Sequence, residues 1–249
     1  MPGLQRMEHY EIIILLGGLA GGLVNGLTGF GTGLTALTFW LYVVPPVVAS
    51  PMVVICSIVG QVQTLPKIWH AISWKRVMPF IIGGVMGVPV GTWLLPSVPV
   101  SAFKIFIGVF LIVFCSYMLT SGKAYKITFG GRIADGIIGL IGGVLGGVAG
   151  LSGAPATMWA GLRGWGKDEK RSIFQAFNLT ILSIALASQA ASGLITREVG
   201  WVTLIALPGT LVGVWIGRRL YEKLGDRGFD RVVYMVLLLS GVMMIVFSL

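Results

Sequence analysis

The sequence predicts an all-α polytopic membrane protein, because charged residues are scarce, long stretches lack them, and clusters of glycine and proline break two apolar regions. Of 249 residues, 55% are hydrophobic and only 11% are charged, against about 25% charged in ordinary soluble domains. A helix needs roughly 20 residues to cross a hydrocarbon core of about 30 Å. Seven stretches of about that length or longer contain no Asp, Glu, Lys or Arg: 12–66, 77–103, 105–122, 136–162, 172–196, 199–217 and 232–249. This pattern excludes a soluble domain.

The apolar stretches divide into simple crossings and two interrupted regions. Residues 11–45 are broken by the glycine-rich segment 25–33, and residues 132–165 are broken by the segment 150–155. Gly costs about 1 kcal/mol inside a helix relative to Ala, and Pro about 3 kcal/mol. We therefore expect both regions to be re-entrant or broken helical hairpins. Six segments are predicted to be simple crossings: 47–68, 77–95, 101–121, 173–195, 199–216 and 232–249.

The distribution of basic residues tests the two hairpins. If each hairpin enters and leaves on one side, 15 of the 18 Lys and Arg residues fall in loops on one face of the membrane, and only Arg6, Lys104 and Arg197 fall on the other. Cytoplasmic loops carry the surplus of basic residues in membrane proteins. We therefore expect the basic side, which includes the loop at 163–171, to be cytoplasmic and both termini to be periplasmic.

A hairpin followed by three crossings is an odd number of passages, so the second half is predicted to be inverted relative to the first. Gly26-Leu27-Thr28-Gly29 is echoed 124 residues later by Gly150-Leu151-Ser152-Gly153, and the G-x-x-x-G pair Gly87 and Gly91 is echoed 126 residues later. Small residues at that spacing let helix backbones pack closely. We expect a single transmembrane domain over residues 1–249, with repeats at about 11–121 and 132–249 and a cytoplasmic linker at 122–131.

The two breaks are the candidate substrate site. A helix that starts inside a membrane offers free N–H groups and the positive end of its dipole to an anion, and two breaks meeting at a pseudo-two-fold axis are typical of transporters. Pro155 is predicted at the first helical position, where its missing N–H costs nothing. The candidate residues in the breaks are Thr28, Gly29, Phe30, Gly31, Thr32, Ser152, Gly153, Ala154 and Pro155.

Amide side chains within the crossings are further candidates. Gln175 and Asn178 are three residues apart and share a helix face, and Asn25 adjoins the first break; we expect these three to contact substrate. The alternative for any such amide, including Gln61, Gln63 and Gln189, is an interhelical hydrogen bond worth about 1 kcal/mol.

Other kinds of function lack the residues they need. No acidic residue lies deep in a crossing, which leaves Asp135 and Glu11 at the rims, so a buried proton relay is not expected. The two histidines, His9 and His70, lie near predicted helix ends, and two cysteines form no metal or disulfide framework. We expect no metal, no cofactor and no enzymatic activity. The net charge of +9 is explained by cytoplasmic loops rather than by nucleic-acid binding.

The two breaks resemble the signatures of a known family. Leu23-Val24-Asn25-Gly26-Leu27-Thr28-Gly29-Phe30-Gly31-Thr32-Gly33 and Gly147-Val148-Ala149-Gly150-Leu151-Ser152-Gly153-Ala154-Pro155 are similar to the first and second repeat signatures of the sulfite exporter TauE/SafE family, also called the toluene sulfonate uptake permeases. The resemblance implies a multi-pass transporter of the bacterial inner membrane for sulfite, sulfonates and related sulfur-containing anions. Ala154-Pro155 departs from the family, whose members commonly carry more glycine there.

We therefore predict a secondary transporter that holds a small anion between the two breaks, within the lipid bilayer, with homo-oligomers possible. Two alternatives stay open: a passive anion channel, which could use the same helix N-termini, and a membrane subunit of a larger complex without transport of its own.

Overall fold

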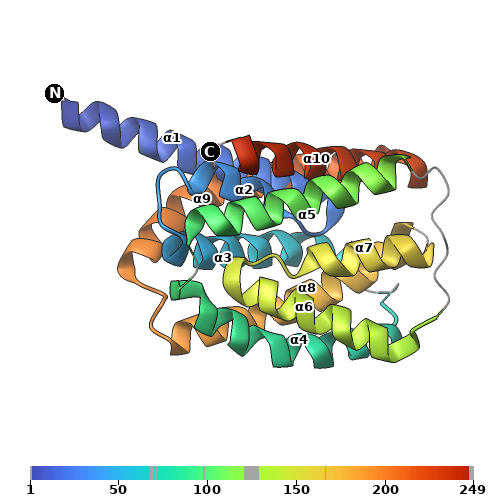
Figure 1. Cartoon of the computed structure of the whole chain (residues 1–249). Helices are drawn as coiled ribbons and strands as arrows, with labels where there is room; N and C mark the ends of the chain where they lie inside the picture. Colours follow the sequence, from blue (N-terminus) through green and yellow to red (C-terminus); the bar gives the residue numbers. More distant parts are fainter. Residues whose placement is uncertain are drawn as a thin grey trace.

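The computed structural model describes residues 2–67, 70, 72–97, 99–120, 129–165 and 167–246. Throughout this part of the chain the regular elements are helices, arranged as a bundle (Figure 1). They are α1 (Pro2–Thr28), α2 (Thr32–Trp40), α3 (Pro46–Thr64), η1 (Leu65–Lys67), α4 (Trp74–Leu94), η3 (Leu95–Ser97), α5 (Val100–Thr120), α6 (Gly131–Ala149), α7 (Gly153–Arg163), α8 (Lys167–Ala191), α9 (Arg197–Lys223) and α10 (Asp226–Val246).

The helices confirm an all-α polytopic membrane protein. Six stretches are long and apolar enough to cross a bilayer: Tyr10–Thr28, Pro46–Thr64, Trp74–Ser97, Gly131–Ala149, Glu169–Ala191 and Arg197–Lys223. The remaining two predicted crossings, 101–121 and 232–249, correspond to α5 and α10, of 21 residues each. In Figure 1, α1 begins and α10 ends toward the left of the bundle.

Both predicted breaks separate two helices that fold back on each other. In the first hairpin, Trp40 near the end of α2 donates its indole N–H to the carbonyl oxygen of Ile14 in α1, at 2.9 Å. Its turn contains Gly29 and Gly31 with φ of 83° and 88°, a backbone conformation that glycine adopts without steric cost. In the second hairpin, which joins α6 to α7, the turn begins at Gly150 with φ of 69°.

One detail of the second hairpin differs from expectation. Pro155 is the third residue of α7, which begins at Gly153, rather than its first; the first turn of a helix still needs no N–H from it. The first helix of each hairpin, α1 or α6, contains a 19-residue apolar span. Along α3, Gly60 lies beside Asn25 of the first break, and Val53 lies beside both Gly33 of the first break and Gly150 of the second.

Two pairs of parallel helices pack with their backbones in contact. A methyl group added to Gly18, Gly22 or Gly26 of α1 would overlap a carbonyl oxygen of α9, and one added to Gly209, Gly213 or Gly217 of α9 would overlap a carbonyl oxygen of α1. The pair α4 and α6 is built in the same way, through Gly83, Gly87, Gly91, Gly139, Gly143 and Gly147. The predicted close packing is therefore confirmed. The like packing of the two pairs agrees with the inverted repeat, which stays a prediction, as do the repeat boundaries.

Candidate functional site

The centre of the bundle is an antiparallel contact between α3 and α8. Gln189 donates through Nε2 to Ser50 Oγ at 3.1 Å, and Gln175 donates through Nε2 to Thr64 Oγ1. Because the helices run in opposite directions, residues later in α3 lie opposite residues earlier in α8. The two contacts fix which residue of α3 faces which residue of α8. A row of buried polar side chains follows each helix at spacings of whole turns: Ser50, Ser57, Gln61 and Thr64 on α3, and Arg171, Gln175, Asn178 and Gln189 on α8.

The first break adds its polar groups to this contact. Asn25 donates through Nδ2 to Thr32 Oγ1 at 2.7 Å and to the carbonyl oxygen of Ser57 at 3.3 Å. Thr28 donates to the carbonyl oxygen of Phe30 at 2.6 Å and accepts from the Phe30 N–H at 3.2 Å. The hydroxyl groups predicted to bind substrate therefore also shape the turn. Asn25, Thr28 and Thr32 are fully buried.

The second break contacts α8. Ser152, directly before α7, donates its hydroxyl to Asn178 Oδ1. One turn into α7, Thr157 donates to the carbonyl oxygen of Gly153 at 2.7 Å. Ala154 and Pro155 complete the buried first turn of the helix. This break thus places a hydroxyl, an amide and a helix N-terminus together.

The two breaks touch through Phe30 and Gly153. A methyl group added to Gly153 would lie 2.6 Å from Cβ of Phe30, and one added to Gly29 would lie 2.8 Å from Cγ of Gln175. Phe30 is 1% exposed and packs edge-on against Phe174 of α8, with ring centroids 5.9 Å apart. The structure therefore brings the predicted residues of both breaks together around α8, in a closed cluster. Gly31 is turned away from it, toward Val24 within the first hairpin.

Sequence reasoning assigned Arg171 to a cytoplasmic loop and missed its place in this cluster. Its guanidinium donates to the carbonyl oxygens of Gly26 at 3.0 Å and Leu27 at 3.4 Å, and to Gln175 Oε1 at 3.4 Å. It also lies 3.7 Å from the centre of the Tyr221 ring. The available signal was its position one residue before a charge-free stretch and four before Gln175, which puts both side chains on one helix face.

Asp135 holds the two helices of the second hairpin together through hydrogen bonds. Trp159 of α7 donates its indole N–H to Asp135 Oδ1 at 2.6 Å, and Arg163 donates to the same oxygen at 3.3 Å. Arg163 also donates to the carbonyl oxygen of Gly131 at 3.2 Å and stacks over the Trp159 ring at 4.9 Å. The carboxylate thus ties the first turn of α6 to the last turns of α7.

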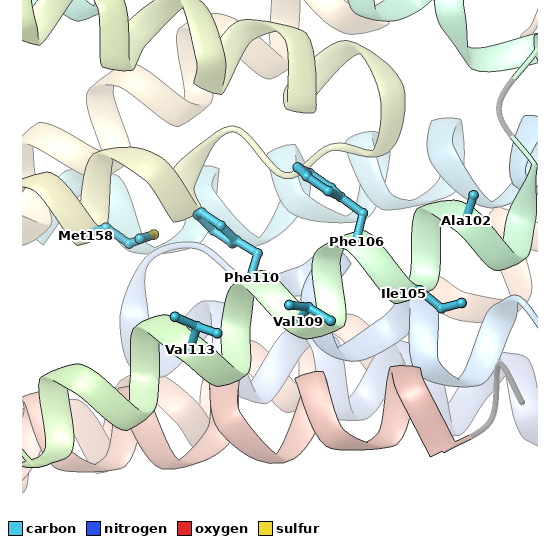
Figure 2. A pocket seen from close by; sticks show the side chains of 7 residues that line it. All are labelled: Ala102, Ile105, Phe106, Val109, Phe110, Val113 and Met158. Atoms are coloured by element: carbon cyan, nitrogen blue, oxygen red, sulfur yellow. The ribbon is translucent and has the colours of Figure 1, made fainter.

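Two grooves lie apart from the breaks. One, of about 840 Å³, is lined only by apolar side chains along α5, with Met158 of α7 at one end (Figure 2). The other, of about 640 Å³, lies between α4 and α6 and has Lys75 and Arg132 in its lining. An apolar lining gives an anion no hydrogen-bond donor, so the α5 groove is not a candidate anion site.

Among the described residues, no group of three or more His, Cys, Asp or Glu side chains could hold a metal ion. Cys56 and Cys115 are buried and free.

Comparison with known proteins identifies the family. The family model for the sulfite exporter TauE/SafE matches residues 13–244, which includes both breaks and every helix of the bundle in whole or in part. No curated protein matches the chain, and no solved structure does. Because the match covers nearly the whole chain, this polytopic membrane protein belongs to the sulfite exporter TauE/SafE family.

Proposed function

We propose that the chain is a secondary transporter of the bacterial inner membrane, with periplasmic termini, that moves sulfite or organosulfonates through the cluster between its two breaks. The observation that carries this proposal is the contact between the breaks. The N-terminal turns of α2 and α7 approach each other around Phe30, and hydroxyl and amide groups surround them. Helix N-termini attract anions through free N–H groups and the positive end of the helix dipole.

The closed geometry favours a carrier over a channel. Phe30 fills the space beside Gly153 and is packed against Phe174, so an anion could enter only after this ring is displaced. A carrier needs such a closed state between its two open states, whereas a conducting channel needs a continuous path. Movement of Phe30 away from α7 is therefore the first step that we propose for access to the site.

Flux measurements in liposomes test the proposal. The purified protein should move sulfite across the liposome membrane at carrier rates and without single-channel currents. The double variant Ser152→Ala and Asn178→Leu removes one hydroxyl and one amide that bond to each other in this cluster. Sulfite affinity should therefore fall about tenfold or more for the loss of buried donors.

Ser183→Ala is the matched control, because this serine lies on the exposed face of the same helix and bonds to the carbonyl oxygen of Leu179. It should leave flux unchanged. Valine at Gly29 or Gly153 should also abolish binding, but it would collide with Gln175 or Phe30 and so requires a parallel measurement of folding. Liposomes without flux of any sulfur-containing anion would contradict the proposal and favour a subunit without transport of its own.

A further inference from the structure

The amide of Gln61 is buried without a use in the fold. The side chain is 0% exposed, and neither Nε2 nor Oε1 has a hydrogen-bond partner among the described residues. The Oδ1 atom of Asn25 is in the same condition. A buried polar atom that loses its hydrogen bonds to water and gains none is unfavourable. An amide that acted as interhelical glue would make those bonds, so Gln61 does not have that role in this conformation.

Gln61 lies at the centre of the candidate site. The contacts of Ser50 with Gln189 and of Thr64 with Gln175 set a register in which Gln61 faces Asn178. Its neighbour Gly60 adjoins the first break, since a methyl group there would lie 2.8 Å from Asn25 Nδ2. The unpartnered amide therefore lies between Asn25, which belongs to the first break, and Asn178, which bonds to Ser152 of the second break.

The orientation of the Asn25 amide follows from its partner. Its Nδ2 atom faces the carbonyl oxygen of Ser57, which can only accept, so Oδ1 is the atom left without a partner. Gln61, the next residue after Gly60, adds a second unpartnered carbonyl oxygen and an unpartnered NH₂ group. The Gln61 NH₂ group can donate to an oxygen of an anion, whereas the two carbonyl oxygens can only accept, so a ligand that bonds to them must carry a hydrogen.

We infer that Gln61 and Asn25 form a subsite for the protonated oxygen of a substrate anion, which makes hydrogensulfite the preferred substrate over an organosulfonate. This inference rests on the proposed transport function and narrows its substrate class. A sulfonate stays ionised at neutral pH and offers only acceptors, which would leave Asn25 Oδ1 and Gln61 Oε1 without a donor. Sulfite takes up a proton near neutral pH, and its protonated form supplies the hydroxyl.

Binding of sulfite and of methanesulfonate to purified protein, compared between variants, tests the inference. Gln61→Leu keeps the side chain's bulk and removes both amide atoms. Sulfite affinity should fall roughly tenfold, as for one lost hydrogen bond to a buried ligand, while methanesulfonate affinity should change less than about threefold. Thermal stability should not fall, because no residue in the described part of the chain makes a hydrogen bond to this amide. Gln63→Leu is the matched control, because Gln63 Nε2 is also buried without a partner but lies off the polar face of the same helix; this variant should leave both affinities unchanged.

A pH titration of the unaltered protein gives a second measurement that requires no variant. Its affinity for total sulfite should weaken as pH rises above neutral, because the protonated anion is depleted, while its affinity for methanesulfonate should stay constant. A Gln61→Leu protein that binds sulfite as tightly as the unaltered protein would overturn the inference and leave the proposed function standing. Equal losses for both anions would overturn the assignment to a protonated oxygen. Absence of binding of either anion to the unaltered protein would contradict the proposed function itself.

Discussion

The guanidinium of Arg171 donates a 3.0 Å hydrogen bond to the carbonyl oxygen of Gly26, across 145 residues of sequence. Gly26 and Leu27 lie in the last turn of α1, where carbonyl groups have no partner further along the helix and where the helix dipole favours a positive charge. Arg171 bonds to both carbonyl oxygens and is 2% exposed. The side chain therefore closes the end of α1 and joins the first break to α8.

Removing this guanidinium should destabilise the protein. Arg171→Met keeps much of the apolar stem but leaves the carbonyl groups of Gly26 and Leu27 buried without a donor, so the free energy of unfolding should fall by about 1–3 kcal/mol. Thermal unfolding in detergent measures the loss. Arg219→Met is the control, because Arg219 is exposed and stacks over the exposed Trp215 ring at 4.6 Å. Equal melting temperatures for the two variants would show that Arg171 is not needed to close α1.

The backbone contact between α4 and α6 should not tolerate a methyl group. In Gly143→Ala the new Cβ would overlap the carbonyl oxygen of Gly84, so the helices must separate, at a cost of about 1–3 kcal/mol or more. Gly200→Ala in α9 is the control, because nothing lies within 4 Å of its Cβ position. Alanine there should stabilise the helix by up to about 1 kcal/mol. Thermal unfolding of both variants checks the prediction, which a stable Gly143→Ala protein would contradict.

Export is expected to be electrogenic and to survive loss of the proton gradient while the membrane voltage is maintained. No carboxylate lies deep in a crossing, and Asp135 at the rim is engaged by Trp159 and Arg163. An uncoupled anion gains about 2.3 kcal/mol per charge per 100 mV when it moves out of an inside-negative compartment. Liposomes with a potassium-diffusion potential and no pH gradient should therefore show flux.

Asp135→Asn separates structure from coupling in the same assay. The variant should leave any pH dependence of flux unchanged and lower thermal stability, since it weakens the hydrogen bonds between α6 and α7. Flux that ignores voltage, follows the pH gradient and loses that dependence in Asp135→Asn would show that the carboxylate carries protons.

Cysteine labelling checks the predicted orientation of the chain. Ser192 and Gly225 are exposed at the ends of α8 and α9, on the predicted periplasmic and cytoplasmic sides respectively, and the two native thiols are buried. In intact cells an impermeant reagent should label Ser192→Cys and leave Gly225→Cys unlabelled until the membrane is opened. Labels at residues 167 and 249 extend the test to the basic loop and the C-terminus. Outside labelling at residue 167 would remove the second hairpin from the topology.

The sequence predicts local features of the fold well, because they depend on neighbouring residues. The turns at Gly29, Gly31 and Gly150 need a left-handed backbone, and glycine clusters within apolar stretches indicate them directly. Pro155 was placed two residues too early in α7 because a helix can begin at any of several small residues. Arg171 and Thr64 escaped prediction for a different reason: their partners, Gly26 and Gln175, lie more than a hundred residues away. Such contacts depend on the packing of α3, α8 and α1, which no local pattern specifies.

The two glycine-lined pairs determine which parts of the molecule can move as rigid bodies. Where backbones touch, no flexible side chains lie between the helices to let one slide past the other. Helix α1, from the first half of the chain, is joined in this way to α9 from the second half, and α6 is joined to α4. Each rigid unit therefore contains one hairpin and one crossing from the opposite half. A motion that parts Phe30 from Gly153 would therefore move these two composite units relative to each other.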